Sequence, residues 1–250
     1  SQQAIRSRHQ ETFHMRLDTT KHRRVMLRVL SDIAADPLLS INLGFKGGTC
    51  CYFLHGLDRF SVDLDFDSLD ENKDEAILVR MREVLAVYGA VKADGRLALK
   101  YPGSVQALIV DVSVRHDINS LNTYEVRDIV SGVPLKVLCK EDIFAHKLVA
   151  LTDRSAGKKE RDRFIANRDL YDIHFFFSHM WSYNKEIIRL RTGEDAKEYL
   201  KHAARFIDIH VDEAHLLEGL GALLDEKKRA WARANLKSEV RRLLNIEAEV

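Results

Sequence analysis

Hydrophobic and polar residues alternate with a period of two through much of the region from Leu43 to Leu138. Such alternation is typical of β-strands, because successive side chains point to opposite faces of a sheet. It predicts strands at RFSVDLDF (59–66), RLALKY (96–101), VQALIVDVSV (105–114), TYEVRDIV (123–130) and PLKVL (134–138). Helices are expected at 21–34, where the segment is basic, in a short stretch after Gly48, and at 72–88.

From Lys140 onward the period changes to 3.6, which is typical of amphipathic helices. The pattern predicts helices at 141–153, 168–180, 194–207, 211–224 and 229–246. The expected fold class is therefore α+β, with an α+β domain at 1–139 that includes the N-terminal basic helix and a helical domain at 140–250. We place the boundary near Cys139.

The composition is that of a folded protein with a sizeable core. The chain has 250 residues, of which 46% are hydrophobic and 31% charged, and this excludes a disordered tail or a collagen-like repeat. The formal net charge is only +1, so a polyanionic partner would have to contact a local basic patch.

The cysteines and the apolar runs indicate where the protein works. Cys50, Cys51 and Cys139 suit neither a disulfide framework nor a CxxC metal motif, which favours a reducing cytoplasm. No apolar run approaches the ~18 residues needed to span a bilayer, and the N-terminus lacks the apolar region of a secretory signal. We expect a cytoplasmic protein with no membrane partner.

The most informative motif is the acidic strand. Alternation places Asp63 and Asp65 on one face of the strand 59–66, together with Arg59 and Ser61. Two neighbouring carboxylates raise each other's pKa unless a cation lies between them, and a hard divalent ion such as Mg²⁺ binds oxygen ligands of this kind. The alternative interpretation is an exposed strand face that carries two solvated aspartates.

Three further features favour a phosphate chemistry. Gly47 and Gly48 precede a predicted helix, so the backbone can approach a phosphate at the helix N-terminus. Asp111 lies in the most apolar strand, where an unpaired carboxylate is costly. Lys147 lies within the apolar arc of its helix, where its stem either snorkels past the core or directs a cation at a phosphate. The eleven histidines form no metal-binding motif and are interpreted as ordinary helix and surface residues.

Five motifs follow one another in a specific order, namely GGT, RxSxDxD, an aspartate on a later strand, EDIFAHKLVALTDR and RDLYDI. Over roughly residues 44–177 the chain resembles the AbiEii/AbiGii-type nucleotidyltransferase toxins, a branch of the DNA polymerase β-like superfamily. The resemblance implies a polymerase β-like nucleotidyltransferase domain with a mixed sheet, followed by a C-terminal helical half.

The resemblance also implies roles for individual residues. Metal-binding acids would be Asp63, Asp65 and Asp111, which would hold two Mg²⁺ or Mn²⁺ ions. Nucleotide-binding residues would be Gly47, Gly48, Thr49, Arg59, Ser61, Lys147 and Asp169. Catalytic residues would be the same three acids with Lys147 and Asp172. For Asp169, just after Asn167, a role at a helix N-terminus is the alternative.

The implied reaction is transfer of a nucleoside monophosphate from an NTP to an acceptor hydroxyl, with release of pyrophosphate. The resemblance favours the tRNA 3′ end as acceptor and a toxin restrained by a cognate antitoxin. Basic residues at 154–168 and within the first 28 residues could contact RNA. Transfer to a protein target and a nucleotide- or RNA-binding protein without catalysis are alternatives. A glycosyltransferase is a weaker one, because the doubly wound βαβ order is missing.

Overall fold

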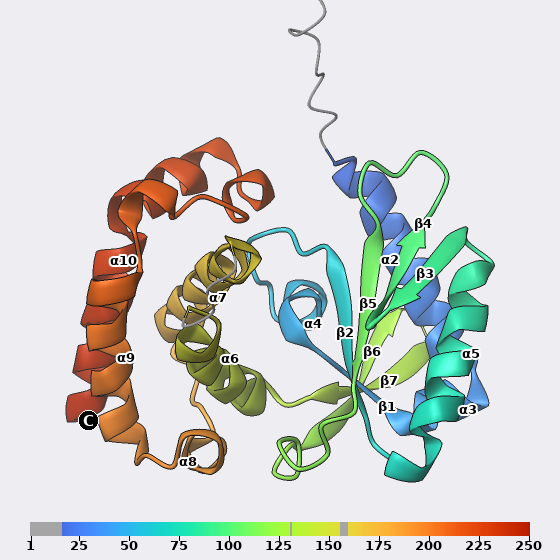
Figure 1. The fold of residues 1–250 in the computed structure, drawn as a ribbon, viewed down its shortest axis with the longest axis horizontal. Helices are drawn as coiled ribbons and strands as arrows, with labels where there is room; N and C mark the ends of the chain where they lie inside the picture. The colour runs from blue at the N-terminus through green and yellow to red at the C-terminus, as the bar shows by residue number, and fades with distance from the viewer. Residues whose placement is uncertain (1–16, 131, 156–159) are drawn as a thin grey trace, which may run out of the picture.

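The computed structural model describes residues 17–130, 132–155 and 160–250 (Figure 1). Within these ranges the helices are α2 (Thr19–Ala35), α3 (Pro37–Asn42), α4 (Gly47–Leu54), α5 (Asp74–Ala86), α6 (Lys140–Ser155), α7 (Glu160–Ser178), α8 (Lys185–Thr192), α9 (Ala196–His210) and α10 (Glu226–Glu249). The strands are β1 (Leu43–Lys46), β2 (Asp63–Ser68), β3 (Ala90–Asp94), β4 (Arg96–Lys100), β5 (Leu108–Ser113), β6 (Tyr124–Val130) and β7 (Val133–Leu138).

One mixed sheet organises the first half of the chain. Its strands lie in the order β3-β4-β5-β2-β1-β7-β6. The central strand β2 pairs parallel with β5 and antiparallel with β1, and β1 pairs parallel with β7. The α+β fold class and the mixed sheet predicted from the sequence are therefore confirmed.

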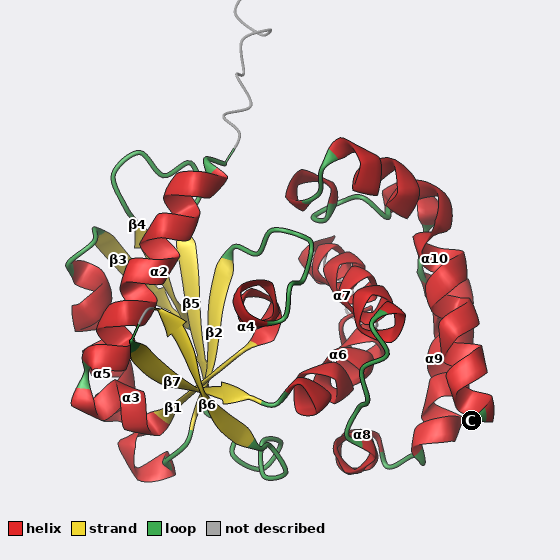
Figure 2. Cartoon of the chain, turned by 180° about the vertical axis from the view of Figure 1, so that it is seen from behind, coloured by secondary structure: helices red, strands yellow, loops and turns green. Residues whose placement is uncertain are grey.

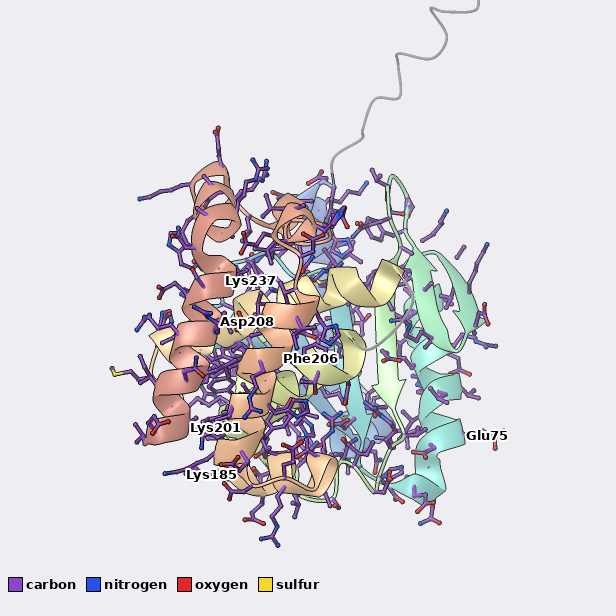
Figure 3. All side chains as sticks on the ribbon, turned by 60° about the vertical axis from the view of Figure 1, so that its left-hand side comes forward. Glu75, Lys185, Lys201, Phe206, Asp208 and Lys237 are labelled. Atoms are coloured by element: carbon purple, nitrogen blue, oxygen red, sulfur yellow. The ribbon has the colours of Figure 1, made fainter. Side chains whose placement is uncertain are left out.

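Helices cover both faces of this sheet. Helices α2, α3 and α5 lie on one side, whereas α4, α6 and α7 lie on the other, with α9 and α10 beyond them (Figures 1 and 2). The outward faces of α9 and α10 carry charged side chains, among them Lys201, Asp208 and Lys237 (Figure 3). Their inward faces bury Leu200, Ile207 and other apolar residues, which explains the 3.6-residue period of these segments.

The hydrophobic core is one cluster of buried side chains. It includes Phe45 and Phe66 of the central strands, Phe144 of α6, Phe176 of α7 and Leu236 of α10. This cluster joins the sheet to the helical half. The division into domains 1–139 and 140–250 stays a prediction. None of the helices in the described ranges is both long and apolar enough to cross a bilayer.

Local boundaries differ from the sequence prediction at several points. The strand expected at 59–66 begins only at Asp63, and the preceding residues form an extended loop. The helix expected at 211–224 is wrong, because that segment contains two 3₁₀ turns, Glu213–His215 and Gly221–Leu223, and Gly219 with a φ of 69° interrupts it.

Three short elements were not predicted, namely β3, α3 and α8. Strand β3 is almost entirely exposed, so it has no alternating apolar face. Helix α8 has eight residues between its N-cap Asn184 and Gly193, whose φ of 73° is typical of a helix C-terminus.

Candidate active site

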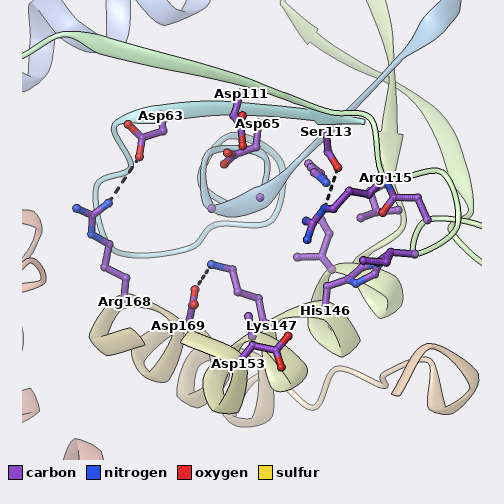
Figure 4. A pocket seen from close by; sticks show the side chains of 18 of the residues that line it. Asp63, Asp65, Asp111, Ser113, Arg115, His146, Lys147, Asp153, Arg168 and Asp169 are labelled. Atoms are coloured by element: carbon purple, nitrogen blue, oxygen red, sulfur yellow. Dashed lines mark hydrogen bonds and ion pairs between the residues drawn. The ribbon is translucent and has the colours of Figure 1, made fainter. Parts of the chain in front are cut away.

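A pocket of about 360 Å³ lies between the sheet and helices α4, α6 and α7 (Figure 4). Nine of the eleven site residues predicted from the sequence line it: Gly47, Gly48, Arg59, Ser61, Asp63, Asp65, Asp111, Lys147 and Asp169. The other two, Thr49 and Asp172, are fully buried behind this lining. The fold thus brings the predicted residues together from five segments of the chain.

The sheet contributes an acidic wall. Asp63 and Asp65 follow each other on the same face of β2, and Asp65 is the register partner of Asp111 on the parallel strand β5. Burial, together with the charge of the neighbouring Asp63, raises the pKa of Asp65 to about 6. Burial also raises the pKa of Asp63. Arg168, whose Nη1 lies 3.7 Å from Oδ2 of Asp63, opposes this shift. Both carboxylates therefore lack sufficient positive charge from the chain itself.

This wall fits a divalent cation that is shared with a substrate. Across the described ranges, no three His, Cys, Asp or Glu side chains are close enough to form a complete metal site. Mg²⁺ in phosphate-transfer sites is commonly held by one or two carboxylates together with water and phosphate oxygens. Asp63 and Asp65, with Asp111 beside them, supply hard oxygen ligands of this kind, and their raised pKa values indicate charge that a cation would neutralise.

The glycine turn brings the start of α4 against the acidic wall. Gly47 has a φ of 79°, and a Cβ atom there would lie 2.4 Å from Oδ2 of Asp65. A Cβ atom on Gly48 would lie 2.7 Å from Nη2 of Arg59. Larger residues would collide with the site, so the glycines allow the backbone N–H groups that begin α4 to approach a ligand in the pocket.

Thr49 does not reach the pocket lining. Its hydroxyl is hydrogen-bonded to the hydroxyl of Ser61 at 2.8 Å and to the backbone carbonyl of Asp63. These contacts attach α4 to the start of β2. The geometry thus favours a positioning role for Thr49, whereas the resemblance had implied direct contact with the triphosphate.

Helices α6 and α7 contribute a wall in which charges are paired. The ammonium group of Lys147 lies 2.5 Å from Asp169 and 2.9 Å from Asp172. Burial by itself would raise the pKa of Asp172, but Arg59 and Lys147 outweigh it and lower the pKa. Lys147 is 15% exposed and ends on two buried carboxylates, so it does not snorkel to solvent. The capping interpretation of Asp169 is wrong, because α7 begins at Glu160.

Arg59 is part of this paired wall. Its Nε and Nη2 donate to the two carboxylate oxygens of Asp172 at 2.6 and 2.7 Å, and Nη1 donates to the carbonyl of Phe60. The side chain is only 3% exposed. Because Nε and Nη2 both bind the carboxylate of Asp172, Arg59 positions Asp172 in this structure.

Several residues of the pocket were missed by sequence analysis. They are Lys46, Arg96, Arg115, His146, Arg168 and Arg191. A sequence signal existed for Arg168, because it directly precedes Asp169 in RDLYDI. Lys46, Arg96 and Arg115 lie at or near strand ends and Arg191 lies on the unpredicted α8, where no motif marks them. His146 lies beside Lys147 in the motif EDIFAHKLVALTDR, but nothing in the sequence singles it out.

Comparison with known proteins gives a consistent result. Residues 28–245 match the family model described as nucleotidyl transferase AbiEii toxin, type IV TA system. A crystal structure from H. pylori assigned as a nucleotidyltransferase is 24% identical, with a TM-score of 0.54, and the match covers 92% of this chain and 96% of that one.

A second structure, JHP933 from Helicobacter pylori, is 22% identical with a TM-score of 0.49 over 92% of this chain and 95% of that one. No curated protein matches the sequence. The family match spans most of the chain and includes the whole pocket. The chain therefore belongs to the AbiEii family of nucleotidyltransferase toxins of type IV toxin–antitoxin systems.

Proposed function

We propose that the protein transfers a nucleoside monophosphate from an NTP to a hydroxyl of RNA, with the tRNA 3′ end as acceptor and Mg²⁺ as the metal. The observation that carries this proposal is the composition of the pocket. The start of α4 at Gly47 and Gly48, two carboxylates with raised pKa values and Lys147 all line one cavity. A cognate antitoxin that restrains the enzyme follows from the type IV family.

The chemistry requires positioning and charge neutralisation more than covalent catalysis. The acceptor oxygen forms a bond to the α-phosphorus, the bond to the pyrophosphate oxygen breaks, and the hydroxyl proton passes to water. Bound divalent ions would lower the pKa of the attacking hydroxyl and neutralise the phosphate oxygens. Asp63 and Asp65, with Asp111, would hold those ions.

The remaining site residues bind and orient the substrate. The first N–H groups of α4 would bind triphosphate oxygens, because a helix N-terminus carries partial positive charge. Lys147 would face the same phosphates. Asp169 and Asp172 fix its ammonium group, and Arg59 in turn fixes Asp172. Lys147 is thus held in place before the substrate arrives.

RNA as acceptor is supported by the resemblance and by the cations that line the pocket. The basic segments expected to contact RNA are only partly described: residues 1–16 and 156–159 lie outside the described ranges. We also propose that the reaction takes place in the cytoplasm, because Cys50, Cys51 and Cys139 are free thiols and two of them are buried.

A labelling experiment tests the proposal. The protein is incubated with each α-labelled NTP, Mg²⁺ and bulk tRNA, beside the Asp63→Asn and Asp65→Asn variants and the exposed control Asp94→Asn. Label on RNA with the wild type and Asp94→Asn, and none with the two site variants, supports the proposal. Label on protein overturns the RNA acceptor. Tight NTP binding without any transfer overturns catalysis and favours a binding protein.

A further inference from the structure

Three cations gather at the end of the pocket that is remote from Asp63. Lys46 precedes α4, Arg115 follows β5, and Arg191 lies on α8, yet all three line the same pocket together with His146 of α6. Figure 4 shows Arg115 and His146 beside Ser113, whereas Asp63 and Arg168 lie at the opposite end. Of these residues, His146 lies within the motif EDIFAHKLVALTDR, but the family resemblance implies no role for it, and the three cations lie outside all five motifs.

His146 is held as a neutral ring between them. Nη1 of Arg191 donates to Nδ1 at 3.2 Å, so Nδ1 carries no proton, and Nε2 donates to Oδ1 of Asn122 at 2.6 Å. Burial, together with the charges of Arg191, Lys46 and Arg115, lowers the pKa of His146 to about 3. The histidine therefore orients Arg191 without adding a fourth positive charge.

Two carboxylates hold two of these cations, Lys46 and Arg191, in place. Asp153 accepts from Nη2 of Arg191 at 2.7 Å. Asp67, which is fully buried on β2, accepts from Lys46 and also from Asn119 at 2.7 Å and the Tyr124 hydroxyl at 2.8 Å. The side chain of Arg191 is 13% exposed and that of Asp153 is 56% exposed. Asp67 thus contacts Lys46 and Asp153 contacts Arg191, whereas Nε of Arg115 donates to the hydroxyl of Ser113 at 3.4 Å.

We propose that Lys46, Arg115 and Arg191 form a second phosphate-binding subsite, with His146 and Asp67 as its positioning residues. The inference rests on the proposed nucleotidyl transfer and specifies how the same pocket holds its substrates. The bound group is a phosphate, supplied either by the outer phosphates of the NTP or by the backbone of the RNA acceptor. Lys46 and Arg191 are already held by carboxylates, so they lose little side-chain entropy when a phosphate binds.

Binding measurements on the whole protein test the subsite without catalysis. Tripolyphosphate and a short single-stranded RNA are titrated calorimetrically, without divalent ions, into the wild type, Arg115→Gln and Arg191→Gln. The matched control is Arg189→Gln, which lies on the same helix and is 69% exposed. Thermal midpoints show whether each variant folds. Because Arg115 is exposed, it tolerates replacement most readily.

We expect Arg115→Gln and Arg191→Gln each to weaken the binding of at least one probe by about fivefold or more. The affinity of the control Arg189→Gln should change less than twofold. A loss confined to tripolyphosphate assigns the subsite to the NTP, and a loss confined to RNA assigns it to the acceptor. For RNA the slope of log K against log salt also falls by roughly 0.7 per lost contact. Wild-type affinity of folded Arg115→Gln for both probes overturns the inference.

His146 is tested by a pair of substitutions. His146→Gln keeps an acceptor for Arg191 and a donor for Asn122, so it is expected to retain binding within about threefold, whereas His146→Leu is expected to lose as much as Arg191→Gln. Equal binding by folded His146→Leu and wild type contradicts the positioning role. Protein that binds both probes through these residues but transfers no nucleotide overturns the proposed function and leaves the subsite intact.

Discussion

The two walls of the pocket treat charge in opposite ways. On the sheet, burial raises the pKa values of Asp63 and Asp65 despite nearby cations, and the charge of Asp63 adds to the shift of Asp65. On the helices, Asp172 has a lowered pKa because Arg59 and Lys147 surround it. The helical wall is electrostatically complete without a ligand, whereas the acidic wall needs a cation. In the proposed function, the helical wall positions groups, whereas the acidic wall supports the chemistry.

The largest expected effect is on the activity of the acidic wall. Asp65→Asn is expected to reduce turnover by about 10³-fold or more, ~4 kcal/mol, because the metal loses a charged ligand. Steady-state transfer assays at saturating Mg²⁺ measure this loss. Asp94→Asn, which replaces an exposed aspartate on β3, serves as the control and should retain wild-type turnover. A tenfold loss or less in Asp65→Asn would remove this residue from the metal site.

The paired wall should instead respond through stability. Asp172→Ala leaves Arg59 buried without its carboxylate, and breaking a buried ion pair in this way costs about 3–5 kcal/mol. Urea denaturation measures the free energy of unfolding. Glu198→Ala, which removes the exposed partner of Lys201, is the control and should cost less than about 1 kcal/mol. Equal stability of Asp172→Ala and wild type would show that the pair is not structural.

Two aspartates on the same face of β2 sharpen the comparison. Asp67→Asn removes the charge that neutralises Lys46 and should cost about 1–3 kcal/mol. Asp65→Asn, two residues earlier, relieves repulsion and should leave the metal-free thermal midpoint unchanged or raise it. Calorimetry of both metal-free variants tests this opposition. A lower midpoint for Asp65→Asn than for Asp67→Asn would reverse our assignment of the two roles.

The smallest effect concerns pH. The pKa of Asp65 in the folded protein is about 6, above its usual value, so the protonated group stabilises the fold at low pH. That contribution disappears as the pH rises from about 4 through about 6. The midpoint of metal-free wild type relative to Asp65→Asn should therefore fall over this range, whereas turnover, which needs the carboxylate, should rise. A pH-independent difference between the two proteins would contradict the raised pKa.

Much of the site was predictable because its residues follow local patterns. Alternation placed Asp63 and Asp65 on one strand face, and helical periodicity marked Lys147 as a cation in an apolar arc. Asp169 and Asp172, which are spaced i, i+3 on one helix, both contact Lys147. Local geometry of strands and helices was sufficient for these inferences.

The remaining features depend on contacts between distant segments. Arg59 and Asp172 are 113 positions apart in the sequence, so no spacing could reveal that the arginine binds this buried carboxylate. Lys46, His146 and Arg191 meet only after the sheet and helices have packed. The failed helix at 211–224 has apolar residues at helical spacing, but the backbone at Gly219 ends the pattern. Periodicity does not report such interruptions.

The most direct test of the central claim is anomalous diffraction from crystals that contain Mn²⁺ and a non-hydrolysable NTP analogue. We predict an anomalous peak bonded to the carboxylates of Asp63 and Asp65, with the triphosphate between that ion and the Gly47–Gly48 start of α4. A fully occupied nucleotide whose phosphates and metal lie away from these two aspartates would contradict the account.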